Sequence, residues 1–222
     1  AKGDNPVLFF SMEMGKGELF ERFIASELGI PLTALIKGET TDAQDKKIEM
    51  YVNKMQDLPL YIDDKSSYTT RDIRRIVRTM KGKHNVKQVV IDYLTYINPT
   101  GSAGNMDLEI TNMVKDLKSM AKDLDVHVML LSQLNRGLEH RDDKRPRLSD
   151  LRSSGSIEQE ADQVIMLYRD SVYSGDDSDM SAEVLVRKFR NGPTGTIHLT
   201  YLGNIVKFVD GAMIQDDPSV VG

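Results

Sequence analysis

The sequence contains no cysteine, which excludes disulfide bonds and thiolate metal sites. Its histidines (His84, His127, His140 and His198) stand far apart and do not show the spacing of metal ligands. No apolar run reaches the length of a transmembrane helix and no signal peptide opens the sequence, so we expect no membrane partner. A reducing cellular interior is compatible with this composition.

Basic residues are fewer than acidic residues. Lys and Arg total 29 against 34 Asp and Glu, which gives a net charge of −5. A freestanding nucleic-acid-binding domain is usually basic, so composition alone disfavours that class. The residues after Phe208 include Asp210, Asp216 and Asp217 and no basic side chain. We therefore expect a folded domain over 1–209 and an acidic, flexible tail over 210–222.

Apolar runs that resemble strands alternate with stripes that resemble helices. The clearest helix covers 106–124, between buried strands predicted at 88–94 and 127–134. A polar stretch, 135–160, then predicts a long functional loop region. Further strands are predicted at 161–169, 182–189, 196–202 and 204–209, with a hairpin turn at Gly203-Asn204. The pattern predicts one α/β domain with a mostly parallel sheet flanked by helices and antiparallel strands at its C-terminal end.

The stretch SMEMGKGEL follows an apolar run and contains Gly15-Lys16, which raises the possibility of a phosphate-binding loop. That loop requires glycine, four residues, Gly-Lys and then Ser or Thr. Phe10 occupies the glycine position and Gly17 follows the lysine. Gly82-Lys83 fails in the same way, since His84 comes next. The printed residues contain no complete phosphate loop, and we interpret Gly15-Lys16 as the start of a helix.

Three apolar runs end in polar residues, namely Glu13, Asp92 and Gln133. In an open parallel sheet, ligands bind beyond the carboxyl ends of the strands, so these side chains are expected to converge. One carboxylate can hold Mg²⁺, a second can activate water, and the amide can contact a phosphate oxygen. The alternative is that each residue merely marks the point where a strand meets water. The three together favour a phosphoryl-transfer site.

Between residues 7 and 209 the sequence contains, in this order, the segments LFFSMEM, VVIDYLTYI, DLKSMAKDLDVHVMLLSQLNRGLEHRDDKRPRLSDLRSSGSIEQEADQVIMLYRD and RKFRNGPTGTIHLTYLG. In sequence, order and spacing these segments resemble the C-terminal ATPase domain of DnaB-type replicative DNA helicases, bacterial or phage. The resemblance implies a RecA-like P-loop NTPase core, a ring-shaped homo-hexamer, and use of ATP and Mg²⁺ for 5′–3′ movement on single-stranded DNA. It also implies duplex unwinding, partnership with a primase and a helicase loader, and a cytoplasmic location in a bacterial cell or phage-infected host.

The family's first strand and phosphate loop precede the FSMEM strand. The resemblance therefore implies a domain that is incomplete at its N-terminus, and the 222 residues alone are expected to lack ATP turnover. By the same resemblance, Glu13 activates water, Asp92 holds Mg²⁺, and Gln133 contacts the γ-phosphate and couples it to the DNA loops.

Lys188 and Arg190, in RKFRNGP, match the family's lysine and arginine finger, which act on the ATP of a neighbouring subunit. Strand alternation predicts that Val184, Val186, Lys188 and Arg190 share one face. The alternative is that both cations are solvated charges on a strand edge.

The segment 149–159 matches a family loop that lines the central pore of the ring. The resemblance assigns DNA contacts to Arg152, Ser153, Ser154 and Gly155, although the family often has an acidic residue where Ser153 stands. Such contacts would meet phosphates without reading sequence. A ring would concentrate six copies of this loop, even though each subunit is acidic. The alternative is an ordinary Gly/Ser-rich loop. NPTGSAGN (98–105) is a second candidate mobile loop.

Two other functions stay open from the sequence. One is a fragment that assembles or binds a helicase without hydrolysing ATP. The other is a different RecA-like ring ATPase, such as a recombinase, against which the extended LSDLRSSGSIEQEAD block argues.

Overall fold

The computed structural model describes residues 5–99, 106–151 and 154–211. The chain splits into two compact units, each described below by itself. The first unit holds Ala1–Phe20, Glu49–Leu134 and Leu151–Ala161, and the second holds Glu21–Ile48, Asn135–Asp150 and Asp162–Gly222. The predicted acidic tail is described only at Asp210, which ends a strand rather than starting a tail, and at Gly211; its other residues lie outside the described ranges, as do residues 100–105 of the second candidate loop.

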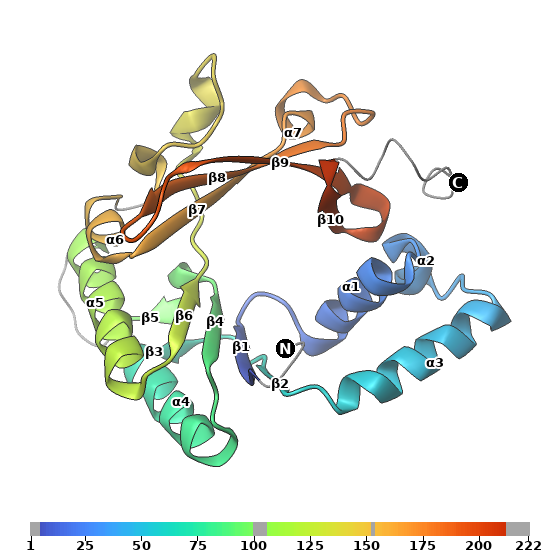
Figure 1. The fold of residues 1–222 in the computed structure, drawn as a ribbon, viewed down its shortest axis with the longest axis horizontal. Coiled ribbons are helices and arrows are strands. Elements are labelled where there is room, and N and C mark those ends of the chain that lie inside the picture. The colour runs from blue at the N-terminus through green and yellow to red at the C-terminus, as the bar shows by residue number, and fades with distance from the viewer. Residues whose placement is uncertain (1–4, 100–105, 152–153, 212–222) are drawn as a thin grey trace. The chain divides into compact units, whose positions relative to one another are not determined.

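The first unit is built on a parallel sheet with strand order β2-β1-β4-β6 (Figure 1). Its strands are β1 (Val7–Ser11), β2 (Leu60–Asp63), β4 (Gln88–Asp92) and β6 (His127–Leu130). Val7 pairs with both Leu60 and Gln88, and Gln88 pairs with His127, so the four strands start in register. Because they run in parallel, their carboxyl ends lie at one edge of the sheet.

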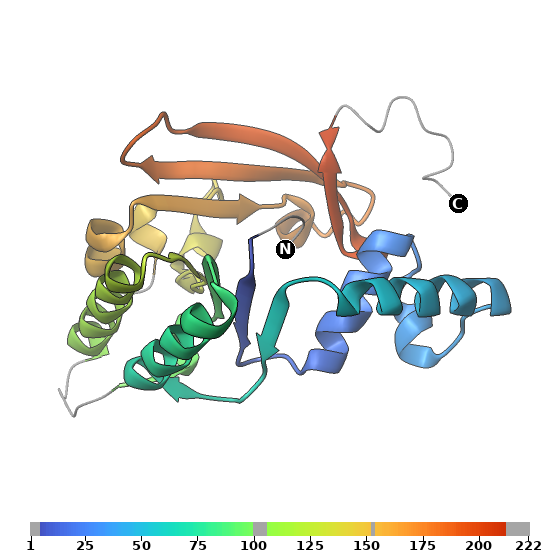
Figure 2. The ribbon, with the colours of Figure 1, turned by 60° about the horizontal axis from the view of Figure 1, so that its bottom comes forward.

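Helices α4 (Thr70–His84) and α5 (Met106–Leu124) pack side by side in this unit (Figures 1 and 2). The apolar stripe predicted for α5 is buried at Ile110, Met113, Val114, Leu117 and Met120, and half-buried at its last residue, Leu124. Thr69 and Asp72 form a capping box at the start of α4. Arg74 of α4 reaches across to Asp123 of α5, 2.8 Å away. These contacts fix the two helices against each other.

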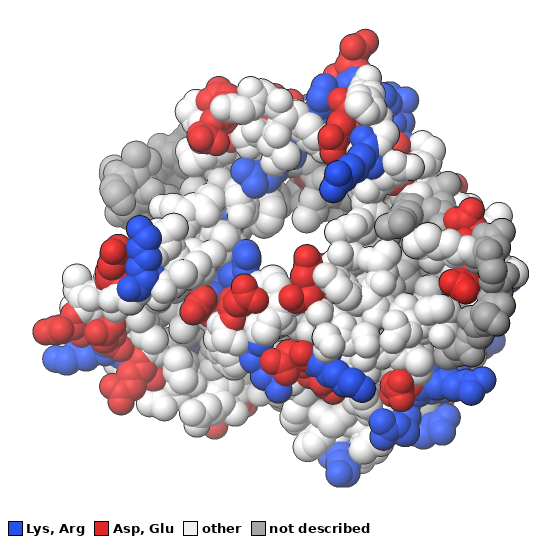
Figure 3. Space-filling model, turned by 180° about the vertical axis from the view of Figure 1, so that it is seen from behind, with Lys and Arg blue, Asp and Glu red and all other residues white. Residues whose placement is uncertain are grey.

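Basic side chains gather over α4 and α5, at the lower right of Figure 3. Helix α4 carries a single acidic residue, Asp72, against Arg71, Arg74, Arg75, Arg78, Lys81 and Lys83. The net negative charge of the chain is therefore distributed unevenly.

The strand predicted over 88–94 is shorter than expected, since β4 ends at Asp92. Leu94–Tyr96 form a 3-10 turn, and β5 (Ile97–Asn98) then pairs with β3 (Tyr68–Thr69). The predicted strand over 127–134 also stops early, at Leu130. The ladder nevertheless continues locally, because the N–H of Leu94 donates to the carbonyl of Leu131 at 3.0 Å.

Three helices follow β1 along the chain: α1 (Lys16–Leu28), α2 (Leu32–Lys37) and α3 (Asp42–Gln56). Helix α1 starts at Lys16, which confirms the interpretation of Gly15-Lys16 as a helix start. Helix α2 ends at Gly38, whose φ of 68° places it in the left-handed region that favours glycine. None of the helices in the described ranges combines the length and apolar character required to span a membrane.

The second unit carries an antiparallel sheet with order β10-β9-β8-β7 (Figure 2). Its strands are β7 (Gln163–Tyr168), β8 (Ser181–Phe189), β9 (Gly195–Leu202) and β10 (Lys207–Asp210), and a short helix α7 (Ser171–Ser174) follows β7. The predicted two-residue turn at Gly203-Asn204 is wrong in detail. Gly203–Ile205 form a 3-10 turn, and Val206 adopts a φ of 50° before β10 begins.

Candidate functional site

The ends of β1, β4 and β6 bring three predicted site residues to one edge of the parallel sheet. Ser11 pairs with Asp92, and the N–H of Met12 donates to the carbonyl of Asp92 at 2.9 Å. Glu13 follows in the bend after β1, and Gln133 follows three residues beyond the end of β6. Each strand therefore places its polar residue at the same edge, as predicted from the apolar runs.

Asp92 and Glu13 form a pair of carboxylates within electrostatic range of each other. Asp92 is half-buried and Glu13 is exposed. Burial raises the pKa of the Asp92 carboxyl above its usual value, and the negative charge of Glu13 raises it further. The two carboxylates thus make this edge a place where a cation would relieve repulsion.

Within the described part of the chain, no group of three or more His, Cys, Asp or Glu could hold a metal ion. A divalent cation here would need ligands from elsewhere. Mg²⁺ is suited to that situation, since it keeps several waters and binds through one or two carboxylates plus substrate phosphates. The residues present, Asp92 with Glu13 beside it, fit a magnesium ion that arrives with a nucleotide.

Two tyrosines complete this edge. The side-chain amide of Gln133 donates from Nε2 to the hydroxyl of Tyr93 at 2.9 Å. The rings of Tyr93 and Tyr96 meet edge to face, with centroids 4.8 Å apart. The sequence assigns neither tyrosine to the site, because it predicts a continuous strand over 88–94 that includes Tyr93, and Tyr96 lies beyond that strand. The available signal was a hydroxyl-bearing residue directly after Asp92.

Lys16 is held by a partner other than phosphate. Its Nζ lies 3.2 Å from Asp64 Oδ1, and its N–H donates to Asp64 Oδ2 at 3.1 Å. This backbone hydrogen bond is the largest cause that lowers the pKa of the Asp64 carboxyl. Lys16 therefore serves the start of α1, in agreement with the failed phosphate-loop spacing.

Lys188 and Arg190 belong to the second unit, and the predicted geometry of their strand is wrong. Lys188 pairs with Val164 of β7, but the next pair joins Val186 to Ile165. The extra residue, Arg187, is a β-bulge. Val164 is buried and Ile165 is exposed, since they point to opposite faces of β7. Lys188 therefore shares the face of Val164 and lies opposite the face that carries Val186.

Arg190 comes directly after β8, two residues beyond Lys188. Its N–H donates to the carbonyl of Asp162 at 2.9 Å, and its Nη1 lies 3.3 Å from the carboxylate of the same residue. Both side chains are about half exposed or more, so this ion pair contributes little stability and can be exchanged. In the following turn, a Cβ on Gly192 would lie 2.5 Å from the Phe189 ring, which explains the glycine.

The candidate DNA segment is only partly described. Arg152 and Ser153 lie outside the described residues. Ser154 and Gly155 begin α6 (Ser154–Glu160), so the second half of the predicted loop is helical. The helix packs on α5 and buries Ile157, a tertiary contact that outweighs the weak helix propensity of Ser and Gly.

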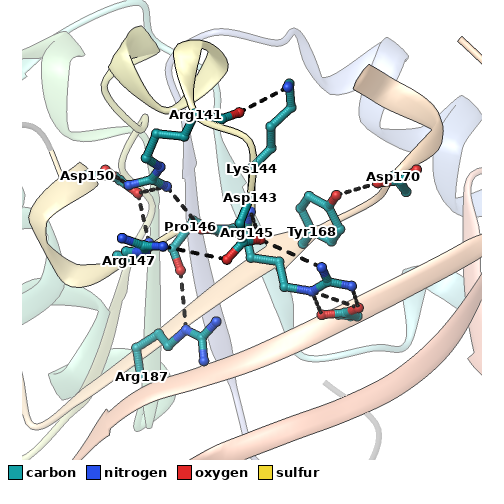
Figure 4. Close-up of polar contacts among 11 residues, drawn as sticks. Arg141, Asp143, Lys144, Arg145, Pro146, Arg147, Asp150, Tyr168, Asp170 and Arg187 are labelled. Atoms are coloured by element: carbon teal, nitrogen blue, oxygen red, sulfur yellow. Dashed lines mark hydrogen bonds and ion pairs between the residues drawn. The ribbon is translucent and has the colours of Figure 1, made fainter. Parts of the chain in front are cut away.

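The segment before it, 135–150, is not an open loop either. It contains two 3-10 turns, Arg136–His140 and Leu148–Asp150. Asp150 is 8% exposed and accepts two hydrogen bonds from Arg141, at 3.0 and 2.8 Å (Figure 4). It also accepts from the N–H of Arg147 at 2.8 Å. Asp150 therefore folds the segment back on itself.

Arg145 ties the same segment to the antiparallel sheet. It donates from Nε and Nη2 to Glu183 at 2.9 and 2.6 Å, and its guanidinium lies 4.8 Å from the ring centre of Tyr168 (Figure 4). The hydrogen bond from Arg145 lowers the pKa of the Glu183 carboxyl. Burial, followed by a hydrogen bond to Asp170, raises the pKa of Tyr168 to about 12. The candidate DNA segment therefore follows a well-anchored stretch.

Comparison with known proteins was made by sequence and by structure. The sequence profile of the DnaB-like helicase C-terminal domain matches residues 1–210. A curated relative, the replicative DNA helicase DnaB of Leifsonia xyli subsp. xyli, is 41% identical over 214 residues, covering 96% of this chain and 47% of the relative. The replicative DNA helicase DnaC of Bacillus subtilis is 38% identical over 221 residues, covering 99% of this chain and 49% of the relative. The chain spans about half the length of these relatives.

A solved structure has the same fold. It is a DnaB-like replicative helicase described with its primase interactions, with a TM-score of 0.87 and 35% identity over 93% of this chain and 51% of that one. The predicted RecA-like α/β fold is confirmed.

Proposed function

The chain belongs to the DnaB-like helicase C-terminal domain family, and on that premise we propose that it is the ATP-driven motor of a replicative DNA helicase. The observation that carries this proposal is the convergence of Glu13, Asp92 and Gln133 at one edge of the parallel sheet. Two carboxylates and an amide are groups that phosphoryl transfer can use to hold the cation, activate water and contact the γ-phosphate.

ATP is the proposed substrate, with Mg²⁺ as its cation. Mg²⁺, when bound, would offset charge on the β- and γ-phosphates. Asp92 would hold the ion, directly or through water. Glu13, more exposed and two residues beyond β1, would orient and deprotonate the attacking water. Gln133 would contact a γ-phosphate oxygen through its amide.

Lys188 and Arg190 are proposed to act on the nucleotide of a neighbouring subunit in a homo-hexamer. The exchangeable contact between Arg190 and Asp162 supports this role, because the guanidinium is held in place yet remains accessible. An arginine supplied in trans can contribute several orders of magnitude in rate. Hydrolysis would then depend on assembly.

Single-stranded DNA is the polymer along which the motor is proposed to move. Arg152, Ser153, Ser154 and Gly155 are proposed to meet DNA phosphates in the ring, as the family membership suggests. We further propose movement from 5′ to 3′, duplex unwinding, and partnership with a primase and a loader, on the basis of the family. A cytoplasmic location in a bacterial or phage-infected cell and the assignment of 1–209 to the motor domain are proposed on the same basis.

The test is an ATPase assay on the full-length encoded protein, with and without single-stranded DNA. We expect turnover that rises when DNA is added. Asp92→Asn should lower it by about a hundredfold or more, because the cation site is lost. Asp57→Asn, a change of the same kind at an exposed turn residue, is the matched control and should keep wild-type turnover.

An assembly-only function predicts a different result. Rings would form and bind DNA, but no turnover would depend on Asp92. Turnover equal in wild type and Asp92→Asn would overturn the assignment of this edge as the catalytic site.

A further inference from the structure

Tyr93 connects the carboxylate and the amide of the candidate site. It follows Asp92 directly, and its hydroxyl accepts the hydrogen bond from Gln133 Nε2 at 2.9 Å. Tyr93 and Gln133 are 40 positions apart, on the ends of neighbouring strands. The bond therefore links β4 and β6 beyond the point where their ladder stops.

The backbone at Tyr93 is fixed from both sides. On one side, the N–H of Met12 donates to the carbonyl of Asp92 at 2.9 Å. On the other side, the N–H of Leu131 donates to Ile91 and the N–H of Leu94 donates to Leu131, each at 3.0 Å. The backbone of Tyr93 is therefore held in place, whereas the exposed Gln133 lies past the end of β6.

The ring of Tyr93 is also supported. Tyr96 packs against it with an interplanar angle of 76°, a favourable edge-to-face arrangement. The Tyr96 hydroxyl forms a hydrogen bond with Tyr93, which raises the pKa of Tyr96, and the charges of Glu13 and Asp92 add to the rise. The phenol pair therefore sits within the electrostatic field of both carboxylates.

The side-chain amide of Gln133 can form further hydrogen bonds to a ligand. A side-chain amide carries two N–H hydrogens and one acceptor oxygen. One hydrogen of Gln133 is directed to Tyr93, so the second hydrogen and the oxygen are available to a phosphate or water. Fixing the first hydrogen restricts where the second can point.

On the basis of the proposed function, we propose that Tyr93 is a positioning residue that fixes the orientation of the Gln133 amide relative to Asp92. A γ-phosphate oxygen would then meet an amide already oriented toward it. Holding the side chain in advance removes the entropy of ordering it during the reaction. Tyr93 acts through Gln133 and does not touch the reacting atoms.

A double-mutant cycle on turnover by the full-length protein tests this role. Tyr93→Phe keeps the ring and removes the hydroxyl, and should lower kcat about fivefold with little change in KM, the loss expected for one hydrogen bond. In a Gln133→Ala background the same change should have almost no further effect. Tyr61→Phe removes a hydroxyl from β2 of the same unit and is the matched control, with unchanged kcat.

A second readout needs no nucleotide. Crystal structures of the nucleotide-free wild type and of Tyr93→Phe should show one ordered Gln133 side chain in the first and several rotamers in the second. An ordered and unmoved Gln133 in the variant would overturn the proposal, as would an undiminished fivefold loss in the Gln133→Ala background. If the wild type proved inactive, the proposed function would fail, and the crystal structures would still decide the role of Tyr93.

Discussion

Lys188 faces Val164 across the β7–β8 ladder, on the side of the sheet opposite Val186. The extra residue that causes this is Arg187. Without Arg187, Lys188 would follow Val186 directly and would still pair with Val164, so the deletion should remove the bulge and leave Lys188 on its present face. We expect turnover by the full-length protein to stay within about tenfold of wild type, because the trans cations keep their face and only local contacts of Arg187 are lost.

The matched control for the deletion is Arg187→Ala. It keeps the bulge residue and removes the hydrogen bond that Arg187 Nε donates to the Pro146 carbonyl at 3.2 Å. Turnover should stay within about tenfold of wild type, since one hydrogen bond is lost. A thousandfold loss in the deletion variant alone would contradict this expectation and show that the bulge itself, and not only the face of Lys188, is required.

Arg190→Ala tests the arginine finger itself. Hydrolysis should fall by about a thousandfold or more while the Kd for ATP changes little, because the side chain stabilises the transition state in a neighbouring site. Mixing Arg190→Ala with Asp92→Asn before assembly should restore part of the turnover, because an Asp92→Asn subunit can donate Arg190 to a neighbour whose Asp92 is intact. No restoration in these mixed rings would place Arg190 in its own subunit's chemistry.

Asp92 should limit stability at neutral pH. Its pKa is raised by burial and by Glu13, so the folded state retains a proton that the unfolded chain loses near pH 3.8. The free energy of unfolding should therefore fall as pH rises through the folded pKa and then level off. Asp92→Asn cannot ionise and should melt above wild type at pH 7.

Thermal melts from about pH 4 to pH 7 measure this difference. The Tm values of Asp92→Asn and wild type should converge toward the acid end, where Asp92 is neutral in both states. Glu13→Gln removes the second cause of the raised pKa and should give a smaller gain at pH 7. An Asp92→Asn variant that melts below wild type at pH 7 would contradict the expected direction of this stability change.

Helical periodicity and the geometry of parallel sheets are enough to predict much of this structure from the sequence. The stripe of α5 follows from 3.6-residue periodicity, and every residue from Ile110 to Met120 in that stripe is buried. Glu13, Asp92 and Gln133 could be grouped because parallel strands end at one edge. None of these steps needed knowledge of a neighbouring strand's register.

Features that depend on contact with a distant segment of the chain could not be predicted from the local sequence. The bulge at Arg187 exists only relative to β7, and the Gln133–Tyr93 bond joins residues from separate strands. The sequence predicts a loop where α6 forms, because Ser and Gly are weak helix formers, whereas the packing of Ile157 stabilises a helix there. Tertiary contacts override local preference in each case.

Asp150 should be the critical carboxylate of segment 135–150. It is buried and accepts from Arg141 twice and from the Arg147 N–H. Asp150→Ala removes the carboxylate partner of the Arg141 guanidinium, which is only 26% exposed and keeps a hydrogen bond to the Arg145 carbonyl. We expect a loss of about 2–3 kcal/mol in the free energy of unfolding, measured by denaturant titration. Asp143→Ala removes an exposed partner of Arg145 and Arg147 and should leave the titration unchanged.

Lys16 should be dispensable for nucleotide binding. Its ammonium group pairs with Asp64 at 3.2 Å, and the spacing around Gly15-Lys16 does not match a phosphate loop. Lys16→Ala in the full-length protein should therefore keep the Kd for ATP within about threefold of wild type, measured by calorimetry. Asp64→Asn weakens the same pair from the other side and should behave alike. A lysine that cradled phosphate would instead lose most of the affinity, and only in the Lys16 variant.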